Sequence, residues 1–495
     1  FSIQNYATLM KTIGIVASHA TESHVTVILN EGMEKEVESE SLVLVENRNG
    51  GKILAVCRSG IGINDVLRAT MYSPGVAYAR TGRQPSTAKE FFGFNLVIIG
   101  DVSKGKIEQN KRIIAPTSPV MIFEKHDDPF SYFGPHNLKI GHYKDVVNWQ
   151  VPVREEYIPF HIGVFGVTGS GKSFFCRYEL IPLLRKAGYD VLVFDWKGSD
   201  YAPYFNGSIS MQDIEMDDEA IISFLCSKAG NFGSGRIADN MRAYLEEALV
   251  DSEWKSHPPE EAKELLYSKM ARIIEDDNKD KQGNITQWGR LYLRRLEKGF
   301  KRISIEDFAT VLGKMGPEQI LEKLRQQHIL VVDMSLGSKE QKLSVFLSIV
   351  RYLKDLMEKK NRLNIALLID EAPQYCPYSP RDIEEETTET ITSLCALGRT
   401  YGLSIILLSQ GIAGEIGINA AVRRNLNTQF IGRIHPLDLE EAAKLFAMSG
   451  VDPESLLRLP EGYFYFVGKM NPSPVPLLLS FQIKEEERVG RSTRA

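Results

Sequence analysis

The chain has 495 residues, more than one hydrophobic core usually holds, so we expect two or three domains. Its net charge of -5 excludes a uniformly basic nucleic-acid binder, and contact with an anionic polymer would need a local patch. Five scattered cysteines without a C-x-x-C pair favour neither a disulfide framework nor a zinc site, and no apolar run reaches the roughly 18 residues of a membrane span. These features predict a cytoplasmic protein without membrane contact.

Residues 1–125 are predicted to be β-structure and to form a small barrel or sandwich. Short apolar runs rich in Val, Ile and Phe are interrupted by Gly, Asn and Asp, and residues 47–52 have the composition of a hairpin turn. A polar linker, residues 126–137, follows and is expected to be mobile. The expected strands lie within residues 13–18, 24–30, 41–59, 75–82, 91–102 and 119–125.

From residue 126 the pattern predicts an α/β core in two parts, 126–211 and 328–470. Strands that alternate with helices indicate a parallel sheet. Residues 212–327 are charged and helical, which predicts a helical insertion inside this core, and residues 471–495 are a C-terminal extension. The expected core strands lie at 161–166, 189–196, 328–335, 364–372, 403–410 and 427–434, with an edge strand at 462–470.

Residues 166–173, GVTGSGKS, fit the phosphate-loop pattern G-x-x-x-x-G-K-[ST] between an expected strand and helix. The glycines let backbone N–H groups turn toward phosphates, and the following helix directs its N-terminus at the same anion. We expect Lys172 to reach the β- and γ-phosphates of ATP and Ser173 to offer its hydroxyl to Mg²⁺. The predicted nucleotide contacts are Gly166, Thr168, Gly169, Ser170, Gly171, Lys172, Ser173 and Phe174.

Two neighbouring acids, Asp370 and Glu371, follow the apolar strand at 364–372. Beside a phosphate loop, an aspartate in this place holds Mg²⁺, and an adjacent glutamate can deprotonate an attacking water. The pair therefore predicts hydrolysis; a solvated turn at the strand end is the alternative. Asp195 and Lys197 follow another strand and are expected at the same sheet edge.

A neutral amide and an arginine accompany the next strand. Gln410 ends the strand at 403–410, where it can contact the γ-phosphate or can simply cap the strand. Arg399 lies at the end of the preceding helix. It is either a surface arginine or a group that stabilises the transferring phosphoryl charge, in its own subunit or in a neighbour.

Five segments in this order resemble the HerA/FtsK branch of RecA-fold motor ATPases, and archaeal HerA proteins most of all: GVTGSGKS, LVFDWKGSDY, LLIDEAPQY, LGRTYGLSIILLSQ and NTQFIGRI. The resemblance runs over nearly the whole chain. It implies a RecA-like core with an N-terminal HAS-barrel and an inserted helical bundle, in a homohexameric ring that hydrolyses ATP with Mg²⁺ and moves along double-stranded DNA. It also implies action with a NurA-type nuclease in DNA end resection and double-strand-break repair, alongside the Mre–Rad complex.

The resemblance also assigns roles to single residues. Lys172 and Ser173 match the phosphate and magnesium contacts, and Asp370 matches the metal-binding acid. Glu371 matches the catalytic acid. Gln410 matches the sensor, and Arg399 the arginine that faces the nucleotide. Further nucleotide contacts are expected from Arg154, Gly468 and Lys469, with Arg424 and Arg433 as weaker candidates.

A translocase holds DNA through its phosphates, for which Lys, Arg, small residues and backbone amides suffice. Two segments fit this chemistry. The loop at 228–240 carries Arg236, and residues 411–425 follow Gln410 directly and carry Arg423 and Arg424. The basic run at 288–302 is either a further DNA contact or a solvated helix face or subunit contact.

Other functions compete with DNA translocation. A motor of conjugation or type IV secretion shares this core, although the expected barrel and the lack of an apolar span argue against it. A small-molecule kinase usually lacks the adjacent Asp–Glu pair and needs a lid. A clamp that binds ATP only to assemble would leave Glu371 without a catalytic role.

Overall fold

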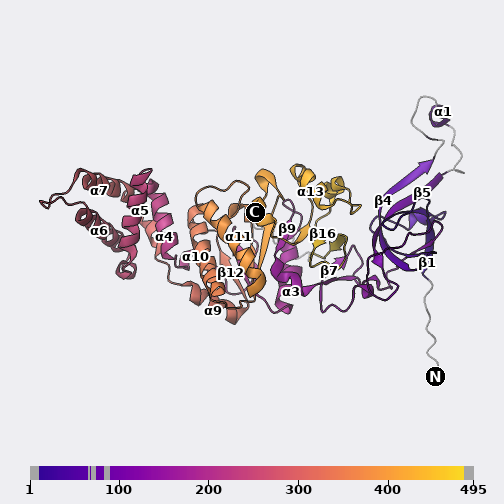
Figure 1. Cartoon of the computed structure of the whole chain (residues 1–495), viewed down its shortest axis with the longest axis horizontal. Helices are drawn as coiled ribbons and strands as arrows, with labels where there is room; N and C mark the ends of the chain where they lie inside the picture. The colour runs from indigo at the N-terminus through magenta and orange to yellow at the C-terminus, as the bar shows by residue number, and fades with distance from the viewer. Residues whose placement is uncertain (1–9, 65–66, 68–73, 83–89, 484–495) are drawn as a thin grey trace, which may run out of the picture.

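Three parts follow one another along the long axis of the computed structural model, which describes residues 10–64, 67, 74–82 and 90–483. Figure 1 shows the N-terminal barrel at one end, a large sheet with covering helices in the middle, and a lobe of helices at the other end. The prediction of an α/β core with a helical insertion and an N-terminal barrel is confirmed. Across the described residues, no helix is both long and apolar enough to cross a membrane.

The N-terminal barrel closes six antiparallel strands in the order β1-β2-β5-β4-β3-β6. Branched side chains such as Val27, Val43 and Ile53 fill its interior, because alternate residues of each strand point inward. In the predicted turn at 47–52, Gly50 and Gly51 have φ of 93° and 107°, which glycine adopts easily. The strands are β1 (Lys11–Val16), β2 (His24–Leu29), β3 (Leu42–Glu46), β4 (Lys52–Asn64), β5 (Glu90–Asp101) and β6 (Pro119–Ile122).

The strand expected at 75–82 is wrong, because helix α1 (Pro74–Thr81) occupies this segment. The flanking strands β4 and β5 pair with each other as far as Asn64 and Glu90, so the segment lies in the connection between two strands that are already partnered. Alanines in the segment also favour helix over strand.

The central sheet has eleven strands in the order β11-β12-β10-β13-β14-β9-β15-β16-β17-β7-β8. The first seven are parallel, so their carboxyl ends meet along one edge. The last four pair antiparallel and extend the sheet toward the barrel. The strands are β7 (Leu138–Tyr143), β8 (Gln150–Val153), β9 (Ile162–Phe165), β10 (Asp190–Asp195), β11 (Ile209–Ser210), β12 (Ile329–Asp333), β13 (Ile365–Ile369), β14 (Leu403–Ser409), β15 (Thr428–Ile431), β16 (Tyr463–Gly468) and β17 (Leu477–Ser480).

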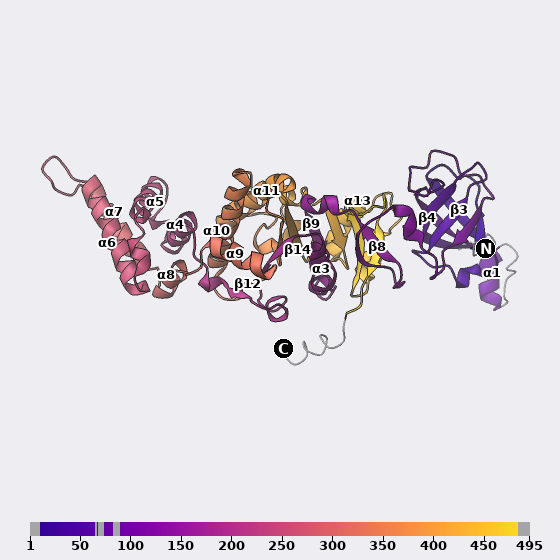
Figure 2. The same cartoon turned by 90° about the horizontal axis from the view of Figure 1, so that it is seen from below.

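Helices cover the sheet and build the lobe. The segment from α4 to α9 is inserted between β11 and β12, and α4 to α8 form a lobe that points away from the barrel, as both views show (Figures 1 and 2). The lobe comprises α4 (Asp218–Lys228), α5 (Arg236–Leu249), α6 (Pro259–Asp277), α7 (Gln287–Phe300) and α8 (Ile305–Val311). Helix α9 (Pro317–Gln327) lies against the sheet beside α10. The other helices of the core are α2 (Lys172–Phe175), α3 (Ile181–Lys186), α10 (Lys339–Glu358), α11 (Ile383–Tyr401), α12 (Ala420–Arg423) and α13 (Leu439–Leu445).

Two further expectations differ from the structure. The segment at 462–470 is not an edge strand, because β16 pairs with both β15 and β17. The segment at 126–137 is not a loose linker, because Phe130 and Phe133 are buried in the core beside β7 and β8. Strand β17 lies in the expected C-terminal extension of 471–495, of which residues 484–495 lie outside the described part.

A buried ion pair joins the barrel to the sheet. Arg58 of β4 donates from Nε and Nη2 to both carboxylate oxygens of Glu40, at 2.9 and 3.0 Å. The same guanidinium donates to the carbonyl oxygens of Ser449 and Pro476, which belong to the sheet domain. Both charged side chains are buried, so this ion pair belongs to the barrel–sheet interface and not to the surface.

Two tyrosines of the sheet complete this junction. Tyr465 of β16 donates its hydroxyl to the Glu40 carboxylate at 2.9 Å, and the hydroxyl of Tyr143 of β7 lies 2.7 Å from the Glu40 carbonyl oxygen and 3.1 Å from its carboxylate. Burial, together with the negative charge of Glu40, raises the pKa of both tyrosines, so they remain protonated donors. Glu40 thus accepts hydrogen bonds from both the barrel and the sheet.

Candidate active site

The phosphate loop connects β9 to α2 as the sequence predicts. Gly169 and Gly171 have φ of 78° and 95°, and a Cβ on Gly166 would lie 2.5 Å from Ser170 Oγ. A Cβ on Gly171 would lie 3.2 Å from the backbone nitrogen of Gly462, so side chains on these residues would be strained or crowded. The loop therefore needs its glycines to hold this tight turn.

Lys172 lies under the loop with its ammonium turned back toward it. Its Nζ donates to the carbonyl oxygens of Gly166 and Val167, at 2.6 and 3.3 Å. Burial lowers the pKa of Lys172, and the nearby carboxylates of Asp370 and Glu371 oppose that shift. The ammonium would gain stronger, charged acceptors if phosphate oxygens entered the loop. Phe174 is buried, so only its backbone is available to a phosphate.

Asp370 follows β13 at the same sheet edge, and its side chain is almost fully buried. Its Oδ2 accepts no hydrogen bond from the described residues. Burial raises the pKa of Asp370 to about 8, with further contributions from the negative charges of Asp200 and Glu371. A buried carboxylate oxygen without a donor is a suitable ligand atom for a cation.

A magnesium ion fits the donor set around Asp370. One carboxylate oxygen each of Asp195, Asp200 and Asp370 lie within 4.8 Å of one another. Hard carboxylate oxygens are the ligands that Mg²⁺ prefers. Asp195 also accepts backbone hydrogen bonds from Gly198, Tyr201 and Ala202, so its carboxylate is held in place. Asp370 and the predicted Ser173 would hold the ion, and Asp195 and Asp200 offer further carboxylate oxygens beside Asp370.

The buried Asp370 carboxyl gives a test by pH. In the apoprotein we expect Asp370→Asn to have a higher free energy of unfolding than the wild type. The difference between the two should grow from about pH 5 to about pH 8 and stay constant above that. In the unfolded chain an aspartate ionises near about pH 4, but folded Asp370 holds its proton to about 8. Between these values the wild type loses up to about 1.4 kcal/mol of stability per pH unit, and asparagine does not titrate.

Denaturant unfolding at each pH, without magnesium, measures this difference in the free energy of unfolding. Asp355→Asn on the exposed face of α10 is the matched control and should show no such widening. A margin that stays constant across this pH range would contradict a protonated, buried Asp370.

Four side chains form a hydrogen-bonded chain across the mouth of the loop. Lys197 Nζ lies 2.5 Å from Glu371 Oε1, and Gln410 Nε2 donates to the same oxygen at 3.2 Å. Thr168 Oγ1 donates to Gln410 Oε1, also at 3.2 Å. Glu371 itself has φ of 51°, a left-handed conformation that sets the direction of its side chain. The chain connects the loop to the ends of β10, β13 and β14.

Four other predicted residues lie at the opposite edge of the sheet. Arg399 ends α11 beside the start of β14, and its guanidinium lies 5.6 Å from the ring centre of Phe160. Lys469 lies 4.8 Å from the same ring centre, next to Gly468 at the end of β16. Arg154 donates its backbone N–H to Met470 in the same region. These four residues therefore do not meet the phosphate loop of their own chain.

The residues expected to contact DNA also lie in different places. Arg423 is engaged inside the chain, because it donates to the carbonyl of Ile412 at 3.0 Å and lies 3.6 Å from Glu441. Arg424 is exposed on the segment that follows β14. Arg236 is exposed at the start of α5, in the helical lobe.

Three groups near the loop were not predicted as ligands or were only weak candidates. Asp200 follows Asp195 by five residues, and its place after a strand was an available signal. Gly462 donates its N–H to the carbonyl of Ser170, a contact between distant segments that no local pattern indicates. Arg433 borders the loop, because its carbonyl accepts from Val167 at 2.7 Å.

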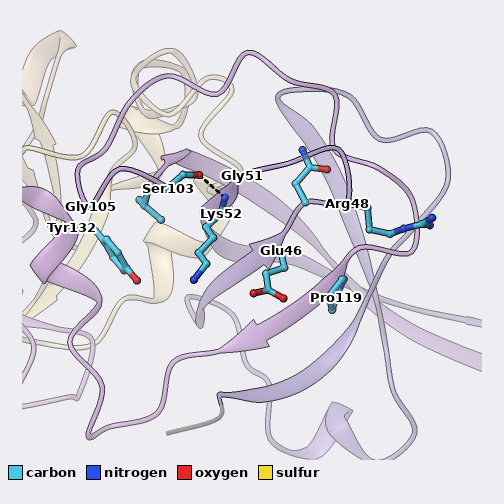
Figure 3. A pocket seen from close by; sticks show the side chains of 10 residues that line it. Glu46, Arg48, Gly51, Lys52, Ser103, Gly105, Pro119 and Tyr132 are labelled. Atoms are coloured by element: carbon cyan, nitrogen blue, oxygen red, sulfur yellow. Dashed lines mark hydrogen bonds between the residues drawn. The ribbon is translucent and has the colours of Figure 1, made fainter. Parts of the chain in front are cut away.

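A depression of about 720 Å³ lies on the barrel beside the turn at 47–52 (Figure 3). Figure 3 shows Glu46, Lys52 and Tyr132 around it, and the backbone N–H of Lys52 donates to Ser103 Oγ at 2.8 Å. The described residues that line it include none of the predicted nucleotide contacts. It is therefore separate from the site at the sheet edge.

Two solved structures are similar to this chain, and the first of them, VirB4, supports the fold. VirB4 of Thermoanaerobacter pseudethanolicus is similar at a TM-score of 0.51 and 15% identity, over 72% of this chain and 99% of that one. The bacterial conjugative coupling protein TrwB, in its unbound form, is similar at a TM-score of 0.46 and 15% identity, over 73% of this chain and 92% of that one. No curated protein matches the chain.

The family comparison covers the part of the chain that carries the site. The model described as "Helicase HerA, central domain" matches residues 138–410. This range begins with β7 and ends at Gln410, and it includes the phosphate loop, Asp370, Glu371 and the whole helical lobe. It spans more than half of the chain, and so the chain belongs to the family of the HerA helicase central domain.

Proposed function

We propose that this chain hydrolyses ATP with Mg²⁺ and uses the energy to move along double-stranded DNA as a homohexameric ring. We also propose that it acts with a NurA-type nuclease in DNA end resection and double-strand-break repair, alongside an Mre–Rad-type complex in the cytoplasm. The observation that carries the proposal is the connection from Thr168 through Gln410 and Glu371 to Lys197, at the mouth of a phosphate loop. Membership of the HerA family supports a motor role.

The site residues divide the hydrolysis between them. The loop amides and Lys172 bind the phosphates, and Glu371 accepts the proton of the attacking water. Lys197 and Gln410 both donate to Oε1 of Glu371, which fixes the direction of the carboxylate. Bound Mg²⁺ would supply charge neutralisation for the β- and γ-phosphates. Thr168 connects the loop to Gln410, so a change at the phosphates can reach the end of β14.

Hydrogen bonds fix the segment that follows Gln410, residues 411–425, so a change at the bound phosphates can pass through Gln410 to this segment. The backbone N–H groups of Ile412 and Ala413 both donate to Asp438 Oδ1, at 3.0 and 3.2 Å. Arg423 binds the Ile412 carbonyl from the other end of the segment. We propose that Arg424, exposed on this segment, and Arg236 contact DNA phosphates, with Arg423 as a positioning residue.

A ring explains the arginine and lysine at the far edge of the sheet. In a head-to-tail ring, one edge of each subunit faces the opposite edge of the next. The edge with Arg399, Lys469 and Arg154 would then face the phosphate loop of a neighbour, where cations stabilise the transferring phosphoryl group. Phe160, between Arg399 and Lys469, keeps both cations at this surface.

Mixed rings test this placement. We expect Lys172→Ala and Arg399→Ala each to lose ATP turnover alone, and their mixture to regain part of it. In a random mixture, about one interface in four pairs an intact loop with an intact arginine from the neighbour. Turnover is measured on each variant and on rings reassembled from both. No recovery in mixed rings of normal mass would contradict an arginine that acts across the boundary.

Duplex DNA distinguishes the translocase from the alternatives. For the wild type we expect a ring-sized particle by light scattering, ATP turnover stimulated by duplex DNA, and weaker stimulation by single strands. A motor of conjugation or type IV secretion, which shares the fold of VirB4, would respond to single strands or to protein instead. Turnover that no DNA stimulates, or a monomer with full turnover, would contradict the proposal.

A further inference from the structure

Helix α7 (Gln287–Phe300) in the helical lobe has two very different faces. One face is buried against the lobe through Tyr292, Leu296 and Phe300. The segment at 286–303 contains six basic residues and one acid, in a chain whose net charge is -5. Four of the basic residues are exposed and follow one another at intervals of four: Arg290, Arg294, Lys298 and Arg302.

Arg290, Arg294 and Lys298 lie in one row on successive turns of one side of α7, because residues four apart are neighbours on a helix, and Arg302 follows just after the helix ends. In the described part of the chain, no carboxylate forms an ion pair with any of them, and the single acid, Glu297, pairs with Lys301 instead. Like charges at this spacing destabilise a helix by about 0.2–0.5 kcal/mol per pair. The repulsion between these charges therefore destabilises α7, and no ion pair among the described residues offsets it.

A glycine-rich loop, followed by a further arginine, lies against the end of the row. The loop from Gly230 to Gly235 precedes α5, and Arg302 Nη1 lies 3.4 Å from the carbonyl of Ala229 at its start. A Cβ on Gly230 would lie 2.3 Å from the same nitrogen, so the glycine permits this approach. Arg236 opens α5 on the other side of the loop. Figures 1 and 2 both show α5 and α7 side by side in the lobe.

The spacing of the row suits a chain of phosphates. Four residues rise by about 6 Å along a helix, so Arg290, Arg294 and Lys298 extend about 12 Å along α7. Each strand of a duplex advances by about 3.4 Å per phosphate along its axis, so the row reaches about three to four phosphates. Backbone contacts of this kind need no base recognition, which suits a protein that moves along any sequence.

We propose that Arg290, Arg294 and Lys298 of α7, with Arg302 just after its end, form a DNA-binding surface that extends the contact proposed for Arg236 and holds the phosphates of duplex DNA. It lies in the helical lobe, away from the phosphate loop and from the segment after Gln410. This inference rests on the proposed function, in which duplex DNA is the track. It extends that function, because the inserted lobe would contact DNA through a surface of several basic side chains.

The test compares two triple variants of the full chain. One carries Arg290→Gln, Arg294→Gln and Lys298→Gln, which leaves Arg302 against its loop. The control carries Arg272→Gln, Lys281→Gln and Lys314→Gln, three exposed basic residues elsewhere in the lobe. Both remove three positive charges, so a general loss of charge affects them equally. Binding to a fluorescent duplex is measured without nucleotide at several salt concentrations.

We expect the row variant to bind duplex DNA about tenfold or more weakly at low salt. The slope of log affinity against log salt should become shallower by about two to three, because each lost phosphate contact removes about 0.9 from the slope. The control should change affinity less than twofold and keep the slope. Unfolding midpoints and particle masses of both variants should match the wild type.

Each other outcome is decisive. If the wild type binds duplex DNA and the row variant keeps its slope, the α7 surface is wrong while the proposed translocase stands. If the row variant forms smaller particles, the row is a contact between copies of the chain, which also overturns the inference. If the wild type binds no duplex DNA, the proposed function itself fails.

Discussion

Glu371→Gln should reduce ATP turnover about 10²- to 10⁴-fold while nucleotide binding persists. Glutamine has almost the same shape, but it is a far weaker base for the proton of the attacking water. The change also removes the charge that holds Lys197, while the phosphate loop and Lys172 remain intact. Turnover with saturating duplex DNA measures the first effect, and binding of a fluorescent ATP analogue measures the second.

Glu385→Gln is the matched control for this experiment. Glu385 is an exposed acid in the first turn of α11, on the same domain, and the same substitution there should leave turnover within twofold of the wild type. Turnover of Glu371→Gln near the wild-type value would contradict the role of Glu371 as the base. A wild type that binds ATP but shows no turnover would instead favour a clamp that binds ATP only to assemble.

The site could be predicted from the sequence where local pattern and topology agree. Asp195, Asp370 and Gln410 each follow a buried parallel strand, and parallel strands in one sheet end at one edge. The sequence alone therefore predicts that these three side chains lie close together. The phosphate loop is equally local, because its glycines, lysine and serine lie within eight residues.

The parts of the fold and of the site that the sequence does not predict depend on contacts between distant segments. Gly462 meets the loop through a backbone hydrogen bond to Ser170, almost 300 residues away in sequence, and nothing near Gly462 indicates a partner. The helix α1 replaced an expected strand because β4 and β5 already pair with each other. Whether a segment forms a strand depends on the partners available in the whole sheet. A short run of Val, Ala and Tyr therefore does not predict a strand by itself.

The junction between barrel and sheet is the clearest contact of this kind. Arg58 and Glu40 are ordinary charged residues in the sequence, yet the fold buries both and surrounds them with donors and acceptors from two domains. Charge patterns in sequence indicate solvated faces far more often than buried pairs. The placement of Tyr143 and Tyr465 against Glu40, with Arg58 against the carbonyls of Ser449 and Pro476, shows that the barrel is fixed to the sheet.

Arg58→Ala should lower the free energy of unfolding by about 3–5 kcal/mol, because it leaves Glu40 buried without its cation. The carbonyl oxygens of Ser449 and Pro476 lose their donors as well. Since the junction joins two domains, we also expect the barrel to unfold in a separate transition at lower temperature. Calorimetry measures both effects. Arg48→Ala is the control, since Arg48 is exposed and its side chain bonds within the barrel.

A double-mutant cycle separates the ion pair from a general loss of packing. Glu40→Ala should also destabilise, but Arg58→Ala combined with Glu40→Ala should cost clearly less than the sum of the two, because no unpaired charge is left. Additive losses, or a loss below about 1 kcal/mol for Arg58→Ala, would contradict a rigid junction. With the junction intact, the barrel is bonded directly to β7 and β16, and any rotation of a subunit during ATP turnover would carry its barrel with it.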